Sequence, residues 1–202
     1  NECVYNNGFS ENLRLGQNVN IFKNNLGGKK TTLKKIDSWS NLSDQDLSLD
    51  SLKMNGFKLD SVVNVSQFNR NNLRALFRNS CILKQNIKKN GKLDLLNGKT
   101  IGLYFDEPSS RTYGSFYVAV KKLGGDVLPL SNNQSSTKKG ESLYDTLKCM
   151  ESYCDLIVIR TRIKGALTND LVGKIKIPII NAGDGDGEHP TQALLDVFTM
   201  RE

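Results

Sequence analysis

The chain has 202 residues, 38% of them hydrophobic, which is enough for one medium-sized domain with a core of its own. Its formal net charge of +7 suits anionic ligands, but the basic residues are scattered and not interleaved with aromatics, which argues against a nucleic-acid partner. No apolar stretch approaches the ~20 residues of a membrane span. With one His and no Cys-x-x-Cys pair, no metal site is expected. We therefore expect a reduced, cytoplasmic protein without a membrane partner.

The first 58 residues are rich in Asn, Ser, Lys and Leu and show little sustained periodicity. Such a composition buries too little apolar surface to offset its ordering entropy, so residues 1–58 are predicted to be a linker or a mostly disordered lead-in. A small appended module is the weaker alternative. Residues 59–202 are predicted to form the folded domain.

Apolar residues recur at helical spacing between Phe68 and Ile87, which predicts an amphipathic helix. Strands and helices then alternate. The predicted strands are 100–105, 126–130, 155–160 and 177–181, and the predicted helices are 110–123, 141–152, 166–173 and one from about 190. Pro129 favours a strand end or a sheet edge for the second strand. The last helix is expected to turn Ala193, Leu194, Val197 and Phe198 toward the core.

This alternation predicts an α/β fold, a doubly wound parallel sheet with helices on both faces. Sites in such sheets lie at the carboxyl ends of the strands. Polar residues stand at those places, namely 109–112 after the first strand, Arg160 at the end of the third and His189 after the fourth.

A turn rich in hydroxyls joins the strand 100–105 to the helix that follows it. Three hydroxyls (Ser109, Ser110, Thr112) and the guanidinium of Arg111 gather where a helix N-terminus favours an anion. Arg binds phosphate or carboxylate with two parallel hydrogen bonds. The alternative, a Ser helix cap beside a solvated Arg, is equally compatible with the local chemistry.

Two motifs carry a resemblance to a known family. The pattern F-x-E-x-S-[ST]-R-T-x-x-S-F over 105–116 resembles the phosphate loop of the carbamoyltransferases. The residues 181–185 and 189–192 resemble the aspartate carbamoyltransferase branch. The similarity runs from about Val62 to Glu202 and implies the fold of the carbamoyl-phosphate-binding domain.

The resemblance implies a role for each matching residue. Ser109, Ser110, Arg111 and Thr112 would bind the phosphate of carbamoyl phosphate. The carbonyl oxygen would be polarised by Arg160, His189 and Thr112, and the side-chain oxygen of Gln192 would accept from the NH2 group. Arg111, Arg160 and His189 are the expected catalytic residues, and no cofactor is implied. For His189-Pro190, a plain helix entry with Pro in its first turn is the alternative.

The loop 134–141 resembles one that the family donates from a neighbouring subunit. Ser135 and Lys139 match its phosphate- and substrate-contacting positions, which implies a homotrimer or a higher assembly. A solvated Ser/Lys/Gly loop is the alternative.

Two positions depart from the family pattern. Ser110 replaces the usual Thr and keeps the hydroxyl, whereas Thr161-Arg162 replaces the usual His-Pro. Arg-Thr at 160–161 faintly favours the ornithine-using branch, while Glu107, Lys139 and Thr191 favour the aspartate branch.

The resemblance therefore implies transfer of a carbamoyl group from carbamoyl phosphate to L-aspartate in pyrimidine synthesis, by one module of a multifunctional polypeptide. The aspartate-binding domain is expected beyond Glu202, so the chain alone is expected to be inactive. The alternatives are an ornithine carbamoyltransferase and a non-catalytic module that keeps the fold.

Overall fold

The computed structural model describes residues 48, 49, 52, 61–131 and 141–201. The predicted linker 1–58 therefore lies almost entirely outside the described residues. Within these residues, nine elements follow the predicted order: α1 (Arg70–Asn90), β1 (Thr100–Phe105), α2 (Ser110–Lys122), β2 (Asp126–Ser131), α3 (Leu143–Glu151), β3 (Leu156–Thr161), α4 (Asn169–Gly173), β4 (Ile179–Asp184) and α5 (Pro190–Arg201). A 3-10 helix that was not predicted, η4 (Val65–Gln67), precedes α1. In the part of the chain that the structure describes, no helix is long and apolar enough to cross a membrane.

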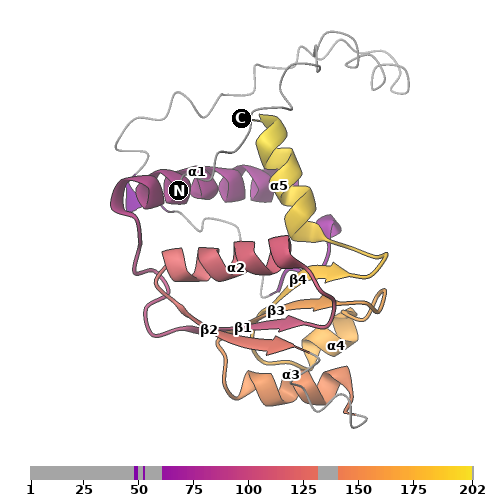
Figure 1. The fold of residues 1–202 in the computed structure, drawn as a ribbon. Coiled ribbons are helices and arrows are strands. Elements are labelled where there is room, and N and C mark those ends of the chain that lie inside the picture. Colours follow the sequence, from indigo (N-terminus) through magenta and orange to yellow (C-terminus); the bar gives the residue numbers. More distant parts are fainter. Residues whose placement is uncertain (1–47, 50–51, 53–60, 132–140, 202) are drawn as a thin grey trace, which may run out of the picture. The chain divides into compact units, whose positions relative to one another are not determined.

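The four strands form one parallel sheet in the order β2-β1-β3-β4. The chain steps from β1 outward to β2 and then returns across β1 to β3. Since parallel crossovers are right-handed, this reversal puts α2 on one face of the sheet and α3 and α4 on the other (Figure 1). The strand order therefore switches between β1 and β3, and the predicted doubly wound α/β sheet is confirmed. Within the described residues β2 pairs only with β1, so Pro129 lies on an edge strand as predicted.

Alternating side chains of the central strands fill the two layers of the core. Leu103 and Phe105 of β1 pack with Val120 of α2, whereas Tyr104 packs in the cluster on the α3 side. On β3, Val158 belongs to the α2-side cluster. Arg160, two residues further on, consequently emerges on the same face as α2. The register pairs it with Phe105 at the end of β1.

The fourth strand was predicted at 177–181 but is found at Ile179–Asp184. Pro178 has no N–H to donate, and its carbonyl accepts from the Ile157 N–H just before the strand begins. At the other end, Ala182 is fully buried and Asp184 pairs with Thr161, so the strand continues through residues whose composition suggested a loop.

Helix α5 begins at Pro190 as predicted, but its predicted apolar side is only partly covered. Val197 is 42% exposed, and its neighbours Leu195 and Met200 are more exposed still. The helix contacts β4 and η4, and Phe198 makes an edge-on contact with Phe77 of α1. The expectation that Val197 faces a core is therefore wrong for the described part of the chain.

Candidate active site

The amino end of α2 lies where β1 ends and keeps its hydrogen-bond donors uncommitted. Ser142 and Thr168 cap α3 and α4, because their hydroxyls accept from the backbone N–H groups of Asp145 and Leu171. Ser109 occupies the same position before α2, but its hydroxyl makes no capping hydrogen bond. The hydroxyl and the first N–H groups of α2 are therefore free to bind an anion.

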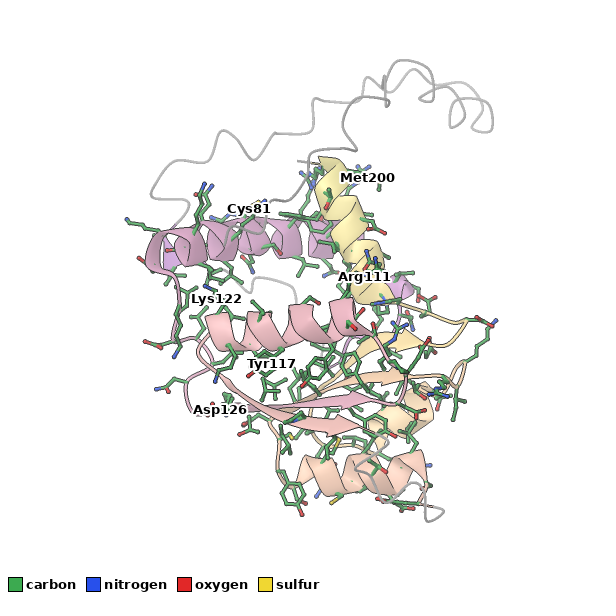
Figure 2. All side chains as sticks on the ribbon, viewed as in Figure 1. Cys81, Arg111, Tyr117, Lys122, Asp126 and Met200 are labelled. Atoms are coloured by element: carbon green, nitrogen blue, oxygen red, sulfur yellow. The ribbon has the colours of Figure 1, made fainter. Side chains whose placement is uncertain are left out.

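The neighbouring residues of α2 add charge and further hydroxyls. Ser110 and Arg111 are exposed and Thr112 is half-buried. Arg111 makes no hydrogen bond or ion pair with other described residues, and Figure 2 places it at the amino end of α2, the end nearer α5 in that view. Its guanidinium is consequently available to a ligand.

Arg160 is held in place by two neighbouring segments. Its Nη1 donates to the Ala182 carbonyl of β4 at 3.0 Å. Its Nη2 lies 3.1 Å from Oε2 of Glu107, which belongs to the loop between β1 and α2. The buried Nε has no hydrogen-bond partner among the described residues. The guanidinium is thus fixed in orientation while several of its five N–H groups remain unused.

Gly183 brings Arg160 and His189 together. Its φ is +121°, and a Cβ placed there would lie 2.6 Å from Nη1 of Arg160 and 3.5 Å from Cδ2 of His189. Both side chains therefore lie against the same glycine, and the ends of β3 and β4 present a cation and an imidazole side by side. The positive φ and the close approach of Arg160 together require a glycine at this position.

His189 precedes α5, and its imidazole is partly buried. Burial lowers the pKa of the imidazole from the usual 6.5, and the positive charge of Arg160 lowers it further, while Asp196 opposes the shift. The ring is therefore neutral at pH 7. Its Nδ1 lies 3.4 Å from the hydroxyl of Thr191.

We expect the imidazole of His189 to titrate below pH 6.5 when followed by NMR, which is direct because the chain contains one His. Since the unfolded chain takes up this proton first, the contribution of His189 to the free energy of unfolding is complete above pH 6.5. It declines as the pH falls from 6.5 toward the folded-state pKa. His189→Gln should remove that part of the pH dependence of stability. A measured pKa at or above 6.5 would contradict the burial described here.

Gln192 is exposed in the first turn of α5. Its Nε2 donates to Asp196 at 2.9 Å, which leaves the side-chain oxygen as a free acceptor. This orientation suits the predicted role of accepting from an NH2 group.

The remaining predicted positions are placed less directly. Ser135 and Lys139 lie outside the described residues. Thr161 is buried and extends β3 by one residue, and Arg162 is exposed beyond it. The atoms nearest to a Cβ at Gly183 belong to Arg160 and His189, not to Arg162. The sequence assigned no supporting role to Glu107, Asn181 and Asp184. Their partners are either far away in the chain or backbone groups, which every residue has, so no local pattern identifies them.

An uncapped helix N-terminus, two arginines and a neutral imidazole at the switch point of a parallel sheet define the class of the site. It is a site for a small anion that also carries a polar, uncharged group.

The comparisons with known proteins agree with this class. The family described as "Aspartate/ornithine carbamoyltransferase, carbamoyl-P binding domain" matches residues 60–202. The chain therefore belongs to the aspartate/ornithine carbamoyltransferase family, as the motifs predicted.

Individual relatives give the same result. The chain is 49% identical over 141 residues to "Multifunctional protein pyr1-3" of Dictyostelium discoideum, covering 70% of this chain and 6% of that protein. It is 40% identical over 147 residues to the "Aspartate carbamoyltransferase catalytic subunit" of Methanobrevibacter smithii, covering 72% of this chain and 46% of that protein. The crystal structure of the Trypanosoma cruzi aspartate transcarbamoylase in complex with carbamoyl phosphate and aspartate matches with a TM-score of 0.66 and 39% identity, over 70% of this chain and 46% of that one. The chain thus spans less than half the length of these relatives.

Proposed function

We propose that the protein transfers the carbamoyl group of carbamoyl phosphate to the amino group of L-aspartate, giving N-carbamoyl-L-aspartate and phosphate. The observation that carries this proposal is that two features lie at the carboxyl ends of the strands: the uncapped N-terminus of α2, and Arg160 and His189, whose side chains meet at Gly183. The relatives support the choice of reaction, because several are named aspartate carbamoyltransferases or multifunctional proteins, and the Trypanosoma cruzi enzyme was crystallised with both substrates.

The residues divide between the two ends of carbamoyl phosphate. The phosphate binds at the start of α2, to Ser109, Ser110, Arg111 and Thr112. The carbonyl oxygen accepts hydrogen bonds from Arg160, His189 and Thr112, and the NH2 group donates to the oxygen of Gln192. Arg160 is suited to its part because Glu107 and Ala182 fix its orientation before any ligand arrives.

The reaction forms one bond and breaks another. The aspartate nitrogen attacks the carbonyl carbon, and an N–C bond forms while negative charge develops on the carbonyl oxygen. The C–O bond to phosphate then breaks, its electron pair leaves with the phosphate, and the phosphate accepts a proton from the amine. His189 is neutral, so it acts as a hydrogen-bond donor to the oxygen rather than as a proton carrier. Its contribution should be largest in the transition state.

The function test uses the full-length protein and the 202-residue chain in parallel. We expect the full-length protein to form N-carbamoyl-aspartate from both substrates. The 202-residue chain should bind carbamoyl phosphate in a calorimetric titration but should not approach the ~10 s⁻¹ typical of enzymes, since it spans less than half of its relatives. Activity with ornithine in place of aspartate would establish the ornithine branch. A full-length protein that binds carbamoyl phosphate but transfers nothing would establish a non-catalytic module.

We further propose that the sites are shared in a homotrimer, with Ser135 and Lys139 acting in the neighbouring subunit's site. The support is the resemblance of the loop 134–141 to the loop that the family donates. Cytoplasmic localisation and membership of a multifunctional pyrimidine-synthesis polypeptide stay predictions from the sequence.

The sharing is tested by mixing two inactive variants of the full-length protein, Lys139→Ala and Arg111→Ala, and refolding them together. With random mixing in a closed ring, about a quarter of the sites receive both intact residues, so activity should return to about a quarter of wild type. If mixed trimers form, as judged by mass, and no activity returns, the two residues act within one chain.

A further inference from the structure

Asp184 is a buried carboxylate directly beneath the candidate active site. It ends β4, is 5% exposed, and is the only carboxylate that is buried among the described side chains. It forms no ion pair with another described residue. Its two oxygens instead accept from backbone groups, Oδ2 from the Gly165 N–H at 2.9 Å and Oδ1 from the Glu188 N–H. A carboxylate whose two oxygens accept from backbone N–H groups holds the backbone in place, as a structural residue does, rather than reacting with a substrate.

The two N–H groups belong to different loops. Gly165 lies in the loop that follows β3 and Arg160, and Glu188 is the residue before His189. The carboxylate therefore ties together the two segments that leave the sheet beside the catalytic residues. It does so from within the fold, because its side chain is out of reach of solvent.

The turn between Asp184 and Glu188 is closed by further hydrogen bonds. The Asp184 N–H donates to the Glu188 carbonyl at 3.2 Å, and the Gly187 N–H donates to the Asp184 carbonyl at 3.0 Å. A Cβ on Gly187 would lie 2.6 Å from Oδ1 of Asp184, so the turn fits closely over the carboxylate. The Gly185 N–H adds a bond to the Thr161 carbonyl of β3 at 2.8 Å.

The position of this turn decides where His189 stands. Gly183, which touches Arg160 and His189, is the residue before Asp184, and His189 is the residue after Glu188. The hydrogen bonds of Asp184 thus set the spacing between Gly183 and His189. A misplacement of about 1 Å in a catalytic group costs on the order of 100-fold in rate.

We propose that Asp184 is a positioning residue for His189, holding the turn 184–188 so that the imidazole meets the carbonyl oxygen of the substrate. This inference rests on the proposed carbamoyl transfer. Asp184 itself does not touch the substrate.

The test is a double-mutant cycle in the full-length protein with Asp184→Asn and His189→Ala. An amide offers one acceptor where the carboxylate offers two, so one of the two loops loses its bond. We expect Asp184→Asn alone to lower kcat about 10-fold, with the KM for carbamoyl phosphate changed less than about 2-fold. In the His189→Ala background the same substitution should cost less than about 2-fold, because its effect acts through the imidazole. Equal costs in both backgrounds would overturn the proposal.

A matched control is Asp155→Asn. This carboxylate also accepts a backbone N–H, from Thr100 at 2.9 Å, but it lies at the amino ends of β1 and β3, the end opposite to the site. It should leave kcat unchanged. Should Asp184→Asn fail to fold, the same double-mutant cycle uses Gly187→Ala. The added Cβ displaces the Asp184 carboxylate, while Gly187 itself is exposed and does not have a positive φ.

A second measurement separates this inference from the proposed function. In the 202-residue chain, Gly187→Ala, which keeps the charge of Asp184, should move the NMR-measured pKa of His189 toward 6.5, because a displaced turn exposes the imidazole. An unchanged pKa in the folded variant would overturn the positioning role even if the wild-type enzyme is active. If the pKa of His189 shifts but the wild-type enzyme transfers no carbamoyl group, the result would support the positioning role of Asp184 and refute the proposed reaction.

Discussion

Arg111→Lys in the full-length protein is expected to lower kcat/KM for carbamoyl phosphate on the order of 100-fold, although the charge is kept. A guanidinium presents planar, paired N–H groups that match two phosphate oxygens, whereas an ammonium is a compact point charge. Arg111 is exposed at the amino end of α2. Its replacement should therefore change the free energy of unfolding by no more than about 0.5 kcal/mol. Steady-state kinetics and thermal melts of the same preparation check both parts.

The control for this variant is Arg162→Lys. Arg162 is also exposed and follows the end of β3, and it was the second cation that the departure from the family pattern introduced. It should leave kcat/KM within about 2-fold, because nothing in the described residues directs its side chain to Gly183. If Arg111→Lys retained near-normal kcat/KM, the phosphate would not bind at the start of α2.

The sheet was predictable because its strands are short and bounded by clear signals. The run 100–105 is apolar and is introduced by a turn, and the structure gives the same bounds. Arg160 could be placed in advance because it ends the predicted strand 155–160, whose apolar residues Ile157, Val158 and Ile159 are buried. The start of α2 could be located in the same way, but its chemistry came from resemblance, since an uncapped Ser109 is indistinguishable from a capped one in sequence.

The support beneath the site was not predictable from local patterns. Asn181 is 1% exposed; its amide donates to the Val63 carbonyl and its oxygen accepts from the Gly183 N–H. The residues 182–184 have the composition of a loop, yet they continue β4, and Asp184 pairs there with Thr161 of β3. On the other side of β4, Val62 pairs with Ile180. That pairing joins segments separated by more than a hundred residues, and no local periodicity reports it. The prediction that the apolar side of α5 faces a core was wrong for Val197 for a related reason. A periodic apolar pattern shows which side of a helix is apolar, but not what that side packs against.

Gly183→Ala is expected to cause a comparable or larger loss, for a reason that involves no charge. The residue has φ of +121°, where an alanine is strained by about 1–3 kcal/mol. Its Cβ would also lie 2.6 Å from Nη1 of Arg160, so the guanidinium must move away from the Ala182 carbonyl and from Glu107. Once displaced, Arg160 no longer meets the carbonyl oxygen where its charge develops.

We therefore expect Gly183→Ala to lower kcat by on the order of 100-fold or more at a temperature where the variant remains folded. Circular dichroism and kinetics on one sample separate this loss from the loss of stability. Gly173→Ala is the control, since a Cβ at Gly173 meets no atom within 4 Å and its φ is not positive. It should preserve kcat. A folded Gly183→Ala protein with normal kcat would show that Arg160 can act from another position, and that its contact with Gly183 is packing alone.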